Sequence, residues 1–328
     1  MLTFVDLFCG AGFGARGAVN AGGQPLLAVD AWDVAAHTYR ENFPDSKVFC
    51  APVEELNPKS LCRGLSPDVL LTSPECTSHS IARGAKPGTE ASRETAISIV
   101  PWLGALKPRW LIVENVRRMK QWDRHNELVN TIEDAGYTVS DLYLNATDFG
   151  APQSRKRMFL VCDQEGTTVT EDHVRGYSKK SRKKNAKSIL SPDRRFTFSP
   201  LYKKGRAKAT IERAERAIAE LGPGVGFIIV YYGSDYAGGW QKLDAPLRTV
   251  TTLDRFALVR WVNDVPHMRM LQPEELLRAM GAPEHTLGQG TRRDRIKLCG
   301  NGVCSPVVEA IWREISARTL EQQLLKAC

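Results

Sequence analysis

The stretch DLFCGAGFG, residues 6–14, decides the fold because it joins an apolar run to a glycine-rich turn and then to a helix-like segment. Gly10, Gly12 and Gly14 allow a backbone to approach a ligand closely. Their GxGxG spacing differs from the GxGxxG order of turns that bind pyrophosphate. The sequence therefore predicts a ligand-binding turn after the first strand, with a purely structural glycine turn as the alternative.

The first half of the chain alternates short apolar runs with segments of helical periodicity. Strands are expected at residues 3–8, 25–30, 68–72, 110–114 and 157–162, and helices near 13–22, 33–42, 90–106 and 123–135. This alternation predicts an α/β fold in which helices cover both faces of a parallel sheet. Ligands bind such sheets beyond the carboxyl ends of the strands, so residues at those ends become site candidates.

Length and composition are those of an ordinary globular protein. The 328 residues are 42% hydrophobic and 25% charged, enough for one large domain or two unequal ones. The start, MLTFVDLF, lacks the basic region of a signal peptide, and no apolar run approaches the roughly 20 residues that span a bilayer. We therefore expect a cytoplasmic, monomeric protein with no membrane partner.

Eight cysteines are scattered along the chain, without a CxxC pair or a histidine spacing typical of zinc sites. We therefore expect no metal. Buried reduced thiols are the simplest interpretation for most of them, since several lie in apolar runs such as MFLVC, which ends at Cys162.

Positive charge is concentrated in one block of the chain. Residues 171–220 contain 15 Lys and Arg against 6 Asp and Glu, a net of +9 in a chain whose formal charge is +8. Such a block favours contact with a polyanion. The alternative is a solvated lysine-rich surface or loop.

The strand–helix alternation ends near residue 165, where the composition changes. We predict a larger domain at 1–165, a small basic domain at 166–294 and a segment at 295–328 that returns to the larger domain. Within the small domain, residues 210–221 are typical of a helix, and FIIVYYG (227–233) and TVTT (249–252) are typical of strands.

Reactive side chains follow the predicted strands. Asp30 ends the second strand, where a carboxylate can accept hydrogen bonds from a ribose diol. Cys76 lies in TSPECTSHS, residues 72–80, just beyond a strand end and therefore placed for nucleophilic attack. A packed free thiol is the alternative for Cys76.

Glu114 and two arginines are the remaining candidates. LIVENV, residues 111–116, brings Glu114 to the carboxyl edge, where desolvation would raise its pKa and suit it to act as an acid. The alternative is a capping or ion-pairing glutamate. Arg155 and Arg157 are two apart and share a strand face, so they can clamp an anion, hold Glu114 or contact a carbonyl oxygen. A solvated edge strand is the alternative.

Taken together and in this order, these motifs resemble those of the DNA cytosine-5 methyltransferase family, especially its prophage-type bacterial members. DLFCGAGFG resembles the S-adenosylmethionine loop, TSPECTSHS the Pro-Cys loop, LIVENV the Glu-Asn-Val strand and PQSRKR the Gln-x-Arg-x-Arg motif. Residues 246–283 resemble the segment that closes the target-recognition domain. GNGVCSPVVEAI, residues 300–311, resembles the Gly-Asn-x-Val-x-Pro-Pro-Val turn.

The resemblance implies a Rossmann-like S-adenosylmethionine-dependent methyltransferase sheet with a smaller, basic target-recognition domain. It implies double-stranded DNA as the partner and a cytosine rotated out of the duplex. By resemblance, Cys76 attacks C6, Glu114 holds and protonates N3, and Arg155 and Arg157 contact the base and order the loop. The cofactor residues implied are Phe8, Gly10, Gly12, Asp30 and Asn301.

Some positions depart from the family pattern. Glu75 replaces a proline beside the nucleophile, where its charge would raise the thiol pKa unless it points away. Thr77 and His79 replace the usual Gln and Phe. The usual cofactor-binding Asp is missing near Pro52, which leaves Glu54 as a substitute. Ala31 occupies the position where the family often has an apolar or aromatic residue that stacks on adenine, and Trp32 lies one position later.

Two other functions fit the same motifs. An RNA cytosine-5 methyltransferase would use the same scaffold, although a long basic recognition segment favours duplex DNA. A catalytically silent nucleic-acid-binding protein would explain the altered residues around Cys76, but the chain keeps Cys76, Glu114 and both arginines. A DNA methyltransferase with these motifs would belong to a restriction–modification system, act as a solitary enzyme or come from a prophage.

Overall fold

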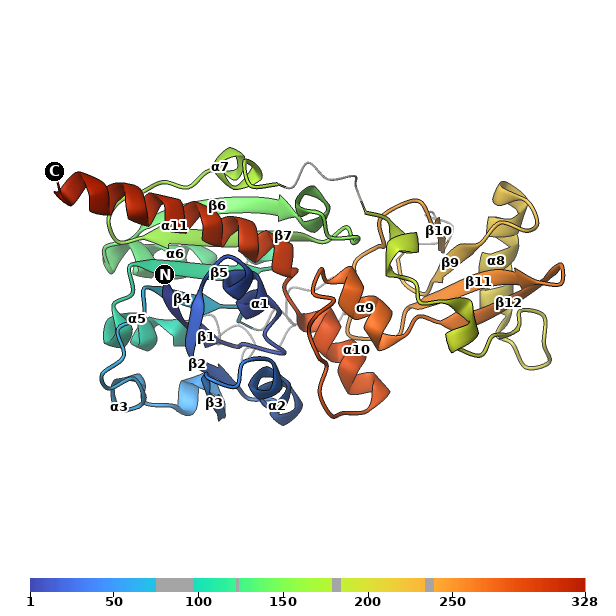
Figure 1. The fold of residues 1–328 in the computed structure, drawn as a ribbon, viewed down its shortest axis with the longest axis horizontal. Coiled ribbons are helices and arrows are strands. Elements are labelled where there is room, and N and C mark those ends of the chain that lie inside the picture. The colour runs from blue at the N-terminus through green and yellow to red at the C-terminus, as the bar shows by residue number, and fades with distance from the viewer. Residues whose placement is uncertain (75–96, 122–123, 179–183, 234–238, 328) are drawn as a thin grey trace.

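The structure is a computed structural model that describes residues 1–74, 97–121, 124–178, 184–233 and 239–327. Two β-sheets lie at opposite ends of an elongated molecule, with helices α9 (Pro273–Ala279) and α10 (Arg292–Asn301) between them (Figure 1). The expected α/β fold is confirmed.

The larger sheet has seven strands in the order β3-β2-β1-β4-β5-β7-β6. Their bounds are β1 Thr3–Leu7, β2 Gln24–Asp30, β3 Lys47–Cys50, β4 Val69–Thr72, β5 Trp110–Asn115, β6 Thr138–Asn145 and β7 Lys156–Asp163. The first five in this order are parallel, whereas β7 runs antiparallel to both β5 and β6.

The reversed direction of β7 corrects the expectation of a wholly parallel sheet. Strand β6 was not predicted, because its alternating burial is typical of a half-exposed strand rather than of a continuous apolar run. Only residues 146–155 join β6 to β7. Such a short connection is typical of antiparallel neighbours, because a parallel pair requires a longer crossover.

Helices cover both faces of this sheet, and each face has its own hydrophobic core. Helices α1 (Phe13–Asn20), α2 (Asp33–Asn42) and α11 (Ser305–Ala327) supply Ala15, Tyr39 and Trp312 to one core. Helices α3 (Pro58–Leu61), α5 (Val100–Leu106) and α6 (His125–Asp134) lie beside the other core, to which α5 and α6 supply Trp102 and Leu128. Two covered faces explain why β4 and β5 are buried along their whole length.

The smaller sheet is antiparallel and has the order β10-β9-β11-β12-β8. Its strands are β8 Ser199–Pro200, β9 Phe227–Val230, β10 Trp240–Lys242, β11 Phe256–Val262 and β12 Val265–Met270. Helix α8 (Lys208–Leu221) packs against β9 and β10. The short helix α7 (Glu171–Arg175) instead lies beside α11, on the larger sheet's side.

The prediction of a strand at TVTT, residues 249–252, is wrong. This segment has no strand assignment, and its backbone and side chains instead bond to residues 153–155. The two strands that follow it, β11 and β12, were not predicted. These residues therefore bond to the lobe of the larger sheet and not to a strand of the smaller lobe, which comprises the smaller sheet and helix α8.

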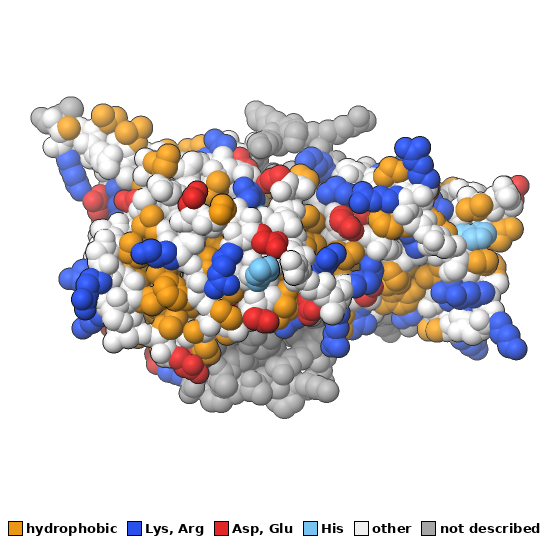
Figure 2. Space-filling model, turned by 60° about the horizontal axis from the view of Figure 1, so that its bottom comes forward, with side chains coloured by type: hydrophobic (Ala, Val, Ile, Leu, Met, Phe, Trp, Pro, Cys, Tyr) orange, Lys and Arg blue, Asp and Glu red, His pale blue; other side chains and the backbone are white. Residues whose placement is uncertain are grey.

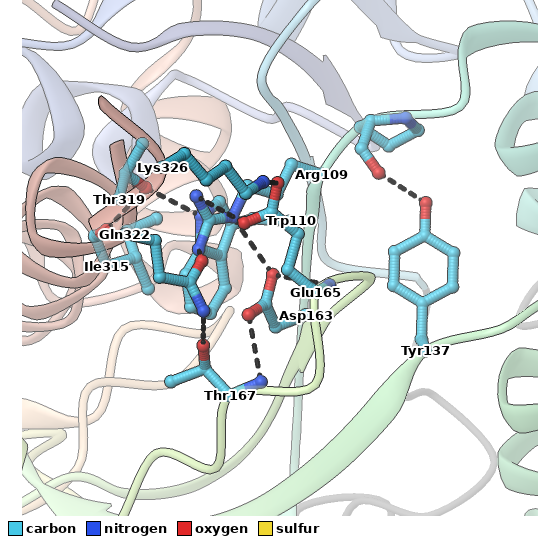
Figure 3. A network of polar contacts seen from close by, with 11 residues as sticks. Arg109, Trp110, Tyr137, Asp163, Glu165, Thr167, Ile315, Thr319, Gln322 and Lys326 are labelled. Atoms are coloured by element: carbon cyan, nitrogen blue, oxygen red, sulfur yellow. Dashed lines mark hydrogen bonds and ion pairs between the residues drawn. The ribbon is translucent and has the colours of Figure 1, made fainter. Parts of the chain in front are cut away.

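The C-terminal helix is fixed to the larger sheet at its far end by a polar network (Figure 3). The Trp110 indole donates to Thr319 Oγ1 at 2.9 Å, and Lys326 Nζ lies 2.7 Å from Glu165 Oε1. Arg109 pairs with Asp163 at 3.1 Å and also bonds to Gln322. Helix α11 therefore packs on the larger sheet and its helix α1.

Helix α11 also approaches α1 closely at Gly17. A Cβ at this position would lie 2.3 Å from the Ser305 carbonyl oxygen and 2.9 Å from the Glu309 nitrogen. Both of those atoms belong to the backbone of α11, so they cannot move aside without displacing that helix.

No helix among the described residues is long and apolar enough to cross a membrane. The same part of the chain contains no group of three or more His, Cys, Asp or Glu side chains that could hold a metal ion.

We predict that Gly17→Ala destabilises the protein by about 1–3 kcal/mol, because the new methyl group overpacks the α1–α11 contact. The free energy of unfolding in urea measures the effect. Gly104→Ala is the matched control, since Gly104 also lies in a helix but a Cβ at that position would have no atom within 4 Å. It should raise stability by about 0.5–1 kcal/mol. Equal effects of the two substitutions would contradict the close helix contact.

Candidate active site at the carboxyl edge of the sheet

The sheet order places the predicted site residues in a row along one edge. Asp30 ends β2, Phe8 follows β1, Pro74 follows β4 and Glu114 lies near the end of β5. Three strand spacings separate Asp30 from Glu114, which is about 14 Å. Cys76 lies outside the described residues, but it follows β4, the strand between the glycine turn and Glu114.

The glycine turn leaves β1 through a left-handed backbone conformation. Phe8 has a φ of 55°, Gly10 of 54° and Gly12 of 83°. At Gly10 the position of a Cβ has no atom within 4 Å, so the backbone there is open to a ligand. At Gly12 a Cβ would lie 2.5 Å from the Phe43 ring, so this glycine is required by packing.

Gly14 does not serve close approach to a ligand, as the sequence suggested. It lies in α1, and a Cβ there would meet the side chain of Leu71 at 3.4 Å. Because 3.4 Å is an ordinary contact distance, close packing does not require a glycine at this position either.

Asp30 is held by the backbone around it. Its two carboxylate oxygens accept hydrogen bonds from the Gly10 and Trp32 amides, each at 2.8 Å. The carboxylate is only partly buried, and a carboxylate oxygen can accept more than one hydrogen bond, so a ligand hydroxyl can join these amides. Burial and the charge of Asp30 raise the pKa of the neighbouring Asp6 well above its ordinary range. The negative charge of this edge is therefore concentrated on Asp30.

Trp32 and Glu54, which depart from the family pattern, and Asn301 have the following surroundings in the structure. The ammonium of Lys297 lies 4.0 Å above the centre of the Trp32 ring, a cation–π contact between α10 and the start of α2. Glu54 is exposed in the short helical turn that follows Pro52. Asn301 is an exposed residue at the end of α10, and the next residue, Gly302, packs against Phe13.

Glu114 forms a buried ion pair with Arg157. The Arg157 Nε lies 3.0 Å from Glu114 Oε1, and the side chains are 15% and 9% exposed. Burial raises the pKa of Glu114, while the charges of Arg157 and Arg155 oppose the rise. The result is a carboxyl group whose proton affinity lies above that of an ordinary glutamate, although it is paired.

Asn115, beside Glu114, was missed as a site residue. Its side chain is 2% exposed, and its Nδ2 donates to the Pro74 carbonyl at 3.2 Å. Its Oδ1 accepts from the Val116 amide at 2.8 Å. The amide therefore ties the chain two residues before Cys76 to the strand that carries Glu114.

Arg155 and Arg157 act on different partners. Arg155 is 3% exposed and donates to the carbonyls of Val250 and Gly300 at 2.9 and 2.8 Å. Gln153, fully buried, donates to Ala279 and accepts from the Val250 amide. Of the alternatives predicted for the arginines, holding Glu114 applies to Arg157 and contacting carbonyls applies to Arg155. The position of Gln153 in the sequence does not predict these contacts, because its partners at Ala279 and Val250 lie far along the chain.

The arrangement combines an open glycine turn and a fixed carboxylate with a second carboxyl group, of raised pKa, that is held by arginine. The glycine turn and Asp30 suit a ligand with a sugar diol. Glu114, held by Arg157, suits donation of a hydrogen bond to a ring nitrogen. The two halves lie on one sheet edge and are bridged by β4.

The chain is similar to several methyltransferases. It is 31% identical over 169 residues to the Type II methyltransferase M.HgiDI of Herpetosiphon aurantiacus, over 50% of this chain and 52% of the relative. It is 30% identical over 143 residues to the human tRNA (cytosine(38)-C(5))-methyltransferase, over 42% and 36% of the two chains. The chain thus spans about half the length, or less, of these two curated relatives.

A solved structure shares the fold. A protein described as a DNA modification methyltransferase encoded within an Escherichia coli prophage superposes with a TM-score of 0.69 at 20% identity, covering 97% of this chain and 99% of that one. The sequence model of C-5 cytosine-specific DNA methylases matches residues 2–317, nearly the whole chain. The chain therefore belongs to the C-5 cytosine-specific DNA methylase family.

Proposed function

We propose that the protein is a DNA (cytosine-5-)-methyltransferase that transfers a methyl group from S-adenosylmethionine to C5 of a flipped cytosine. The observation that carries the proposal is the buried Glu114–Arg157 pair beside the Asn115–Pro74 hydrogen bond. They support a carboxyl group of raised pKa on the strand that Asn115 ties to Pro74, two residues before Cys76 in the sequence. Family membership supports the same reaction.

The glycine turn and Asp30 fit the cofactor. The open space at Gly10 admits a ligand against the backbone, and the partly exposed, fixed carboxylate of Asp30 suits ribose hydroxyls. Phe8, Gly10, Gly12 and Asp30 would hold the cofactor, with Asn301 at the end of α10 completing the set. Bound S-adenosylmethionine supplies an electrophilic methyl group on its sulfonium sulfur.

The protein's own groups activate the cytosine. The Cys76 thiolate adds to C6, and Glu114, as the acid, donates its proton to N3, which makes C5 nucleophilic. Arg157 keeps the carboxyl group of Glu114 in place through their ion pair. After the methyl group has bonded to C5, loss of the C5 proton to water breaks the C6–S bond and releases the Cys76 thiolate. N3 then returns its proton to the Glu114 carboxylate.

Arg155 has a positioning role in this proposal. Its guanidinium donates to two backbone carbonyls, at Val250 and Gly300, whereas Arg157 is the arginine that pairs with Glu114. Arg155 therefore connects the strand that carries Arg157 with the segments leading to the smaller sheet and to α11. The proposed mechanism assigns it no direct contact with the base.

The smaller lobe would bind DNA. Exposed cations such as Arg194, Arg195, Lys203 and Lys204 belong to it, and Figure 2 shows Lys and Arg side chains on this lobe with few acidic ones in view. Phosphate contacts from such cations support duplex binding. We propose that residues 166–294 contribute target recognition and that 295–328 return to the catalytic domain, 1–165.

The covalent step can be trapped with duplex DNA that contains 5-fluorocytosine, because fluorine cannot leave C5 as a proton does. With S-adenosylmethionine present, the wild-type protein should remain attached on a denaturing gel, and Cys76→Ser should form no adduct. Cys62→Ala is the matched control, since burial raises the pKa of the Cys62 thiol to about 11 and keeps it unreactive. It should trap normally. A Cys76→Ser adduct would refute the nucleophile, and a wild-type protein that binds DNA without an adduct would favour a silent homologue.

Glu114→Gln should lower kcat by about 10²–10⁴-fold, because the amide cannot protonate N3. Affinity for S-adenosylmethionine should not change, since Glu114 lies about three strands from Asp30. Single-turnover methylation and equilibrium dialysis separate the two effects. Glu127→Gln, an exposed helix substitution, serves as the control and should retain full activity. Full activity in Glu114→Gln would remove the acid from the mechanism.

The nucleic-acid class can be tested directly with labelled S-adenosylmethionine. We predict that label enters duplex DNA of mixed sequence and not tRNA transcripts. We also predict that DNA affinity falls steeply as salt rises, because Lys and Arg contacts release counterions. The similarity to a human tRNA methyltransferase makes RNA the outcome to exclude. Incorporation into tRNA alone would assign the RNA reaction instead.

A further inference from the structure

The segment between α9 and α10, residues 280–291, packs against helix α2 and the glycine turn. The Thr286 backbone and the Asn42 side chain exchange two hydrogen bonds, each 3.0 Å long. The Thr38 hydroxyl donates to the Leu287 carbonyl at 3.3 Å. These bonds fix residues 286–287 to helix α2 without any help from the side chain of His285.

His285 points from this segment to the glycine turn. It is 4% exposed, and its Nε2 lies 2.5 Å from the Ala11 carbonyl oxygen. A carbonyl can only accept, so Nε2 carries the hydrogen and donates it. The ring is stacked on Phe13 with centroids 4.9 Å apart and an angle of 30° between the planes.

Arg16 fixes the same tautomer from the other side of the ring. Its Nε–H lies 3.4 Å from His285 Nδ1, which must therefore be the unprotonated nitrogen. Burial and the charge of Arg16, opposed by the hydrogen bond to Ala11, lower the pKa of His285 to about 4. Arg16 also lies 3.9 Å from the carboxylate of Glu284. The ring is thus neutral at physiological pH, with its donor aimed at Ala11.

The hydrogen bond from His285 completes the fixation of one peptide unit. The Gly12 amide donates to the Cys9 carbonyl at 2.9 Å, while the Ala11 oxygen of the same peptide plane accepts from His285. The Gly10 amide is separately fixed by Asp30. A glycine turn has little resistance to peptide rotation of its own, so these side chains set its conformation.

We propose that His285 is a positioning residue that holds the glycine turn, residues 9–12, in the conformation that receives the cofactor. The inference rests on the proposed function, because it takes this turn as the S-adenosylmethionine site. His285 acts through Ala11 rather than by touching the reacting atoms. Its donor atom, more than its ring, is the part that the turn requires.

Two variants separate the donor from the ring. His285→Phe keeps an aromatic ring over Phe13 but leaves the buried Ala11 carbonyl without its donor. His285→Gln loses the ring but places an amide nitrogen at the same number of bonds from Cβ as Nε2. His125→Phe is the matched control, because His125 is also a buried histidine but lies on α6, away from the glycine turn.

Equilibrium dialysis with labelled S-adenosylmethionine and steady-state methylation provide the readouts. His285→Phe should raise the Kd and KM for S-adenosylmethionine by about tenfold, because an unpaired buried carbonyl favours other turn conformations. Its kcat at saturating cofactor should stay close to wild type. His285→Gln should restore most of the affinity, and His125→Phe should match the wild type.

Several results would overturn the inference. Wild-type affinity in His285→Phe would show that the turn does not need the donor. Equal loss of affinity in both His285 variants, with equal loss of thermal stability, would assign the ring a packing role only. If His285→Phe does not fold, His285→Gln alone still decides, since weak binding by a folded His285→Gln contradicts the donor role. Failure of the wild-type protein to bind S-adenosylmethionine would instead refute the proposed function, and this inference with it.

Discussion

The hydrogen bonds of Gln153 and Arg155 are the constraint on which the arrangement of the molecule depends. These two buried side chains satisfy backbone groups of Val250, Ala279 and Gly300, which belong to three separate segments of the chain. Buried backbone groups require partners, so an apolar residue at either position would leave carbonyls or amides unpaired. The smaller sheet and the C-terminal helices are therefore positioned by polar contacts with a definite geometry, and not by apolar packing alone.

Arg155 also connects these contacts to the proposed acid, Glu114, through its neighbour Arg157. Arg155 and Arg157 are separated by one residue at the start of β7, and Arg157 pairs with Glu114. A displacement of Val250 or Gly300 would therefore move Arg155, and with it Arg157 two residues later in the ion pair. A short stretch of extended backbone at the start of β7 thus connects these segments to the proposed acid.

Sequence periodicity predicted the parts of the fold that depend on local pattern. Buried runs marked β1, β2, β4, β5 and β7, and their ends brought Asp30 and Glu114 to one edge. The antiparallel direction of β7 was missed because direction depends on the length of a connection whose own strand, β6, has a half-exposed pattern. Asn115, Gln153 and His285 were missed for another reason. Each bonds to a backbone group distant in sequence, and a backbone group has no signature in the amino-acid letters.

The thiols of the described residues also narrow the choice of nucleophile. Burial raises the pKa of the thiols of Cys9, Cys62, Cys162, Cys299 and Cys304, which opposes formation of the thiolate. Cys50 is exposed, but it ends β3, four strand spacings or about 19 Å from β5. In the proposed mechanism the nucleophile attacks the same ring whose N3 Glu114 protonates, and Cys50 is too distant for that. Cys76 follows β4, the strand directly beside β5, and Asn115 ties that strand's exit at Pro74 to the strand of the acid. Sheet order, rather than any property of the thiol itself, therefore favours Cys76.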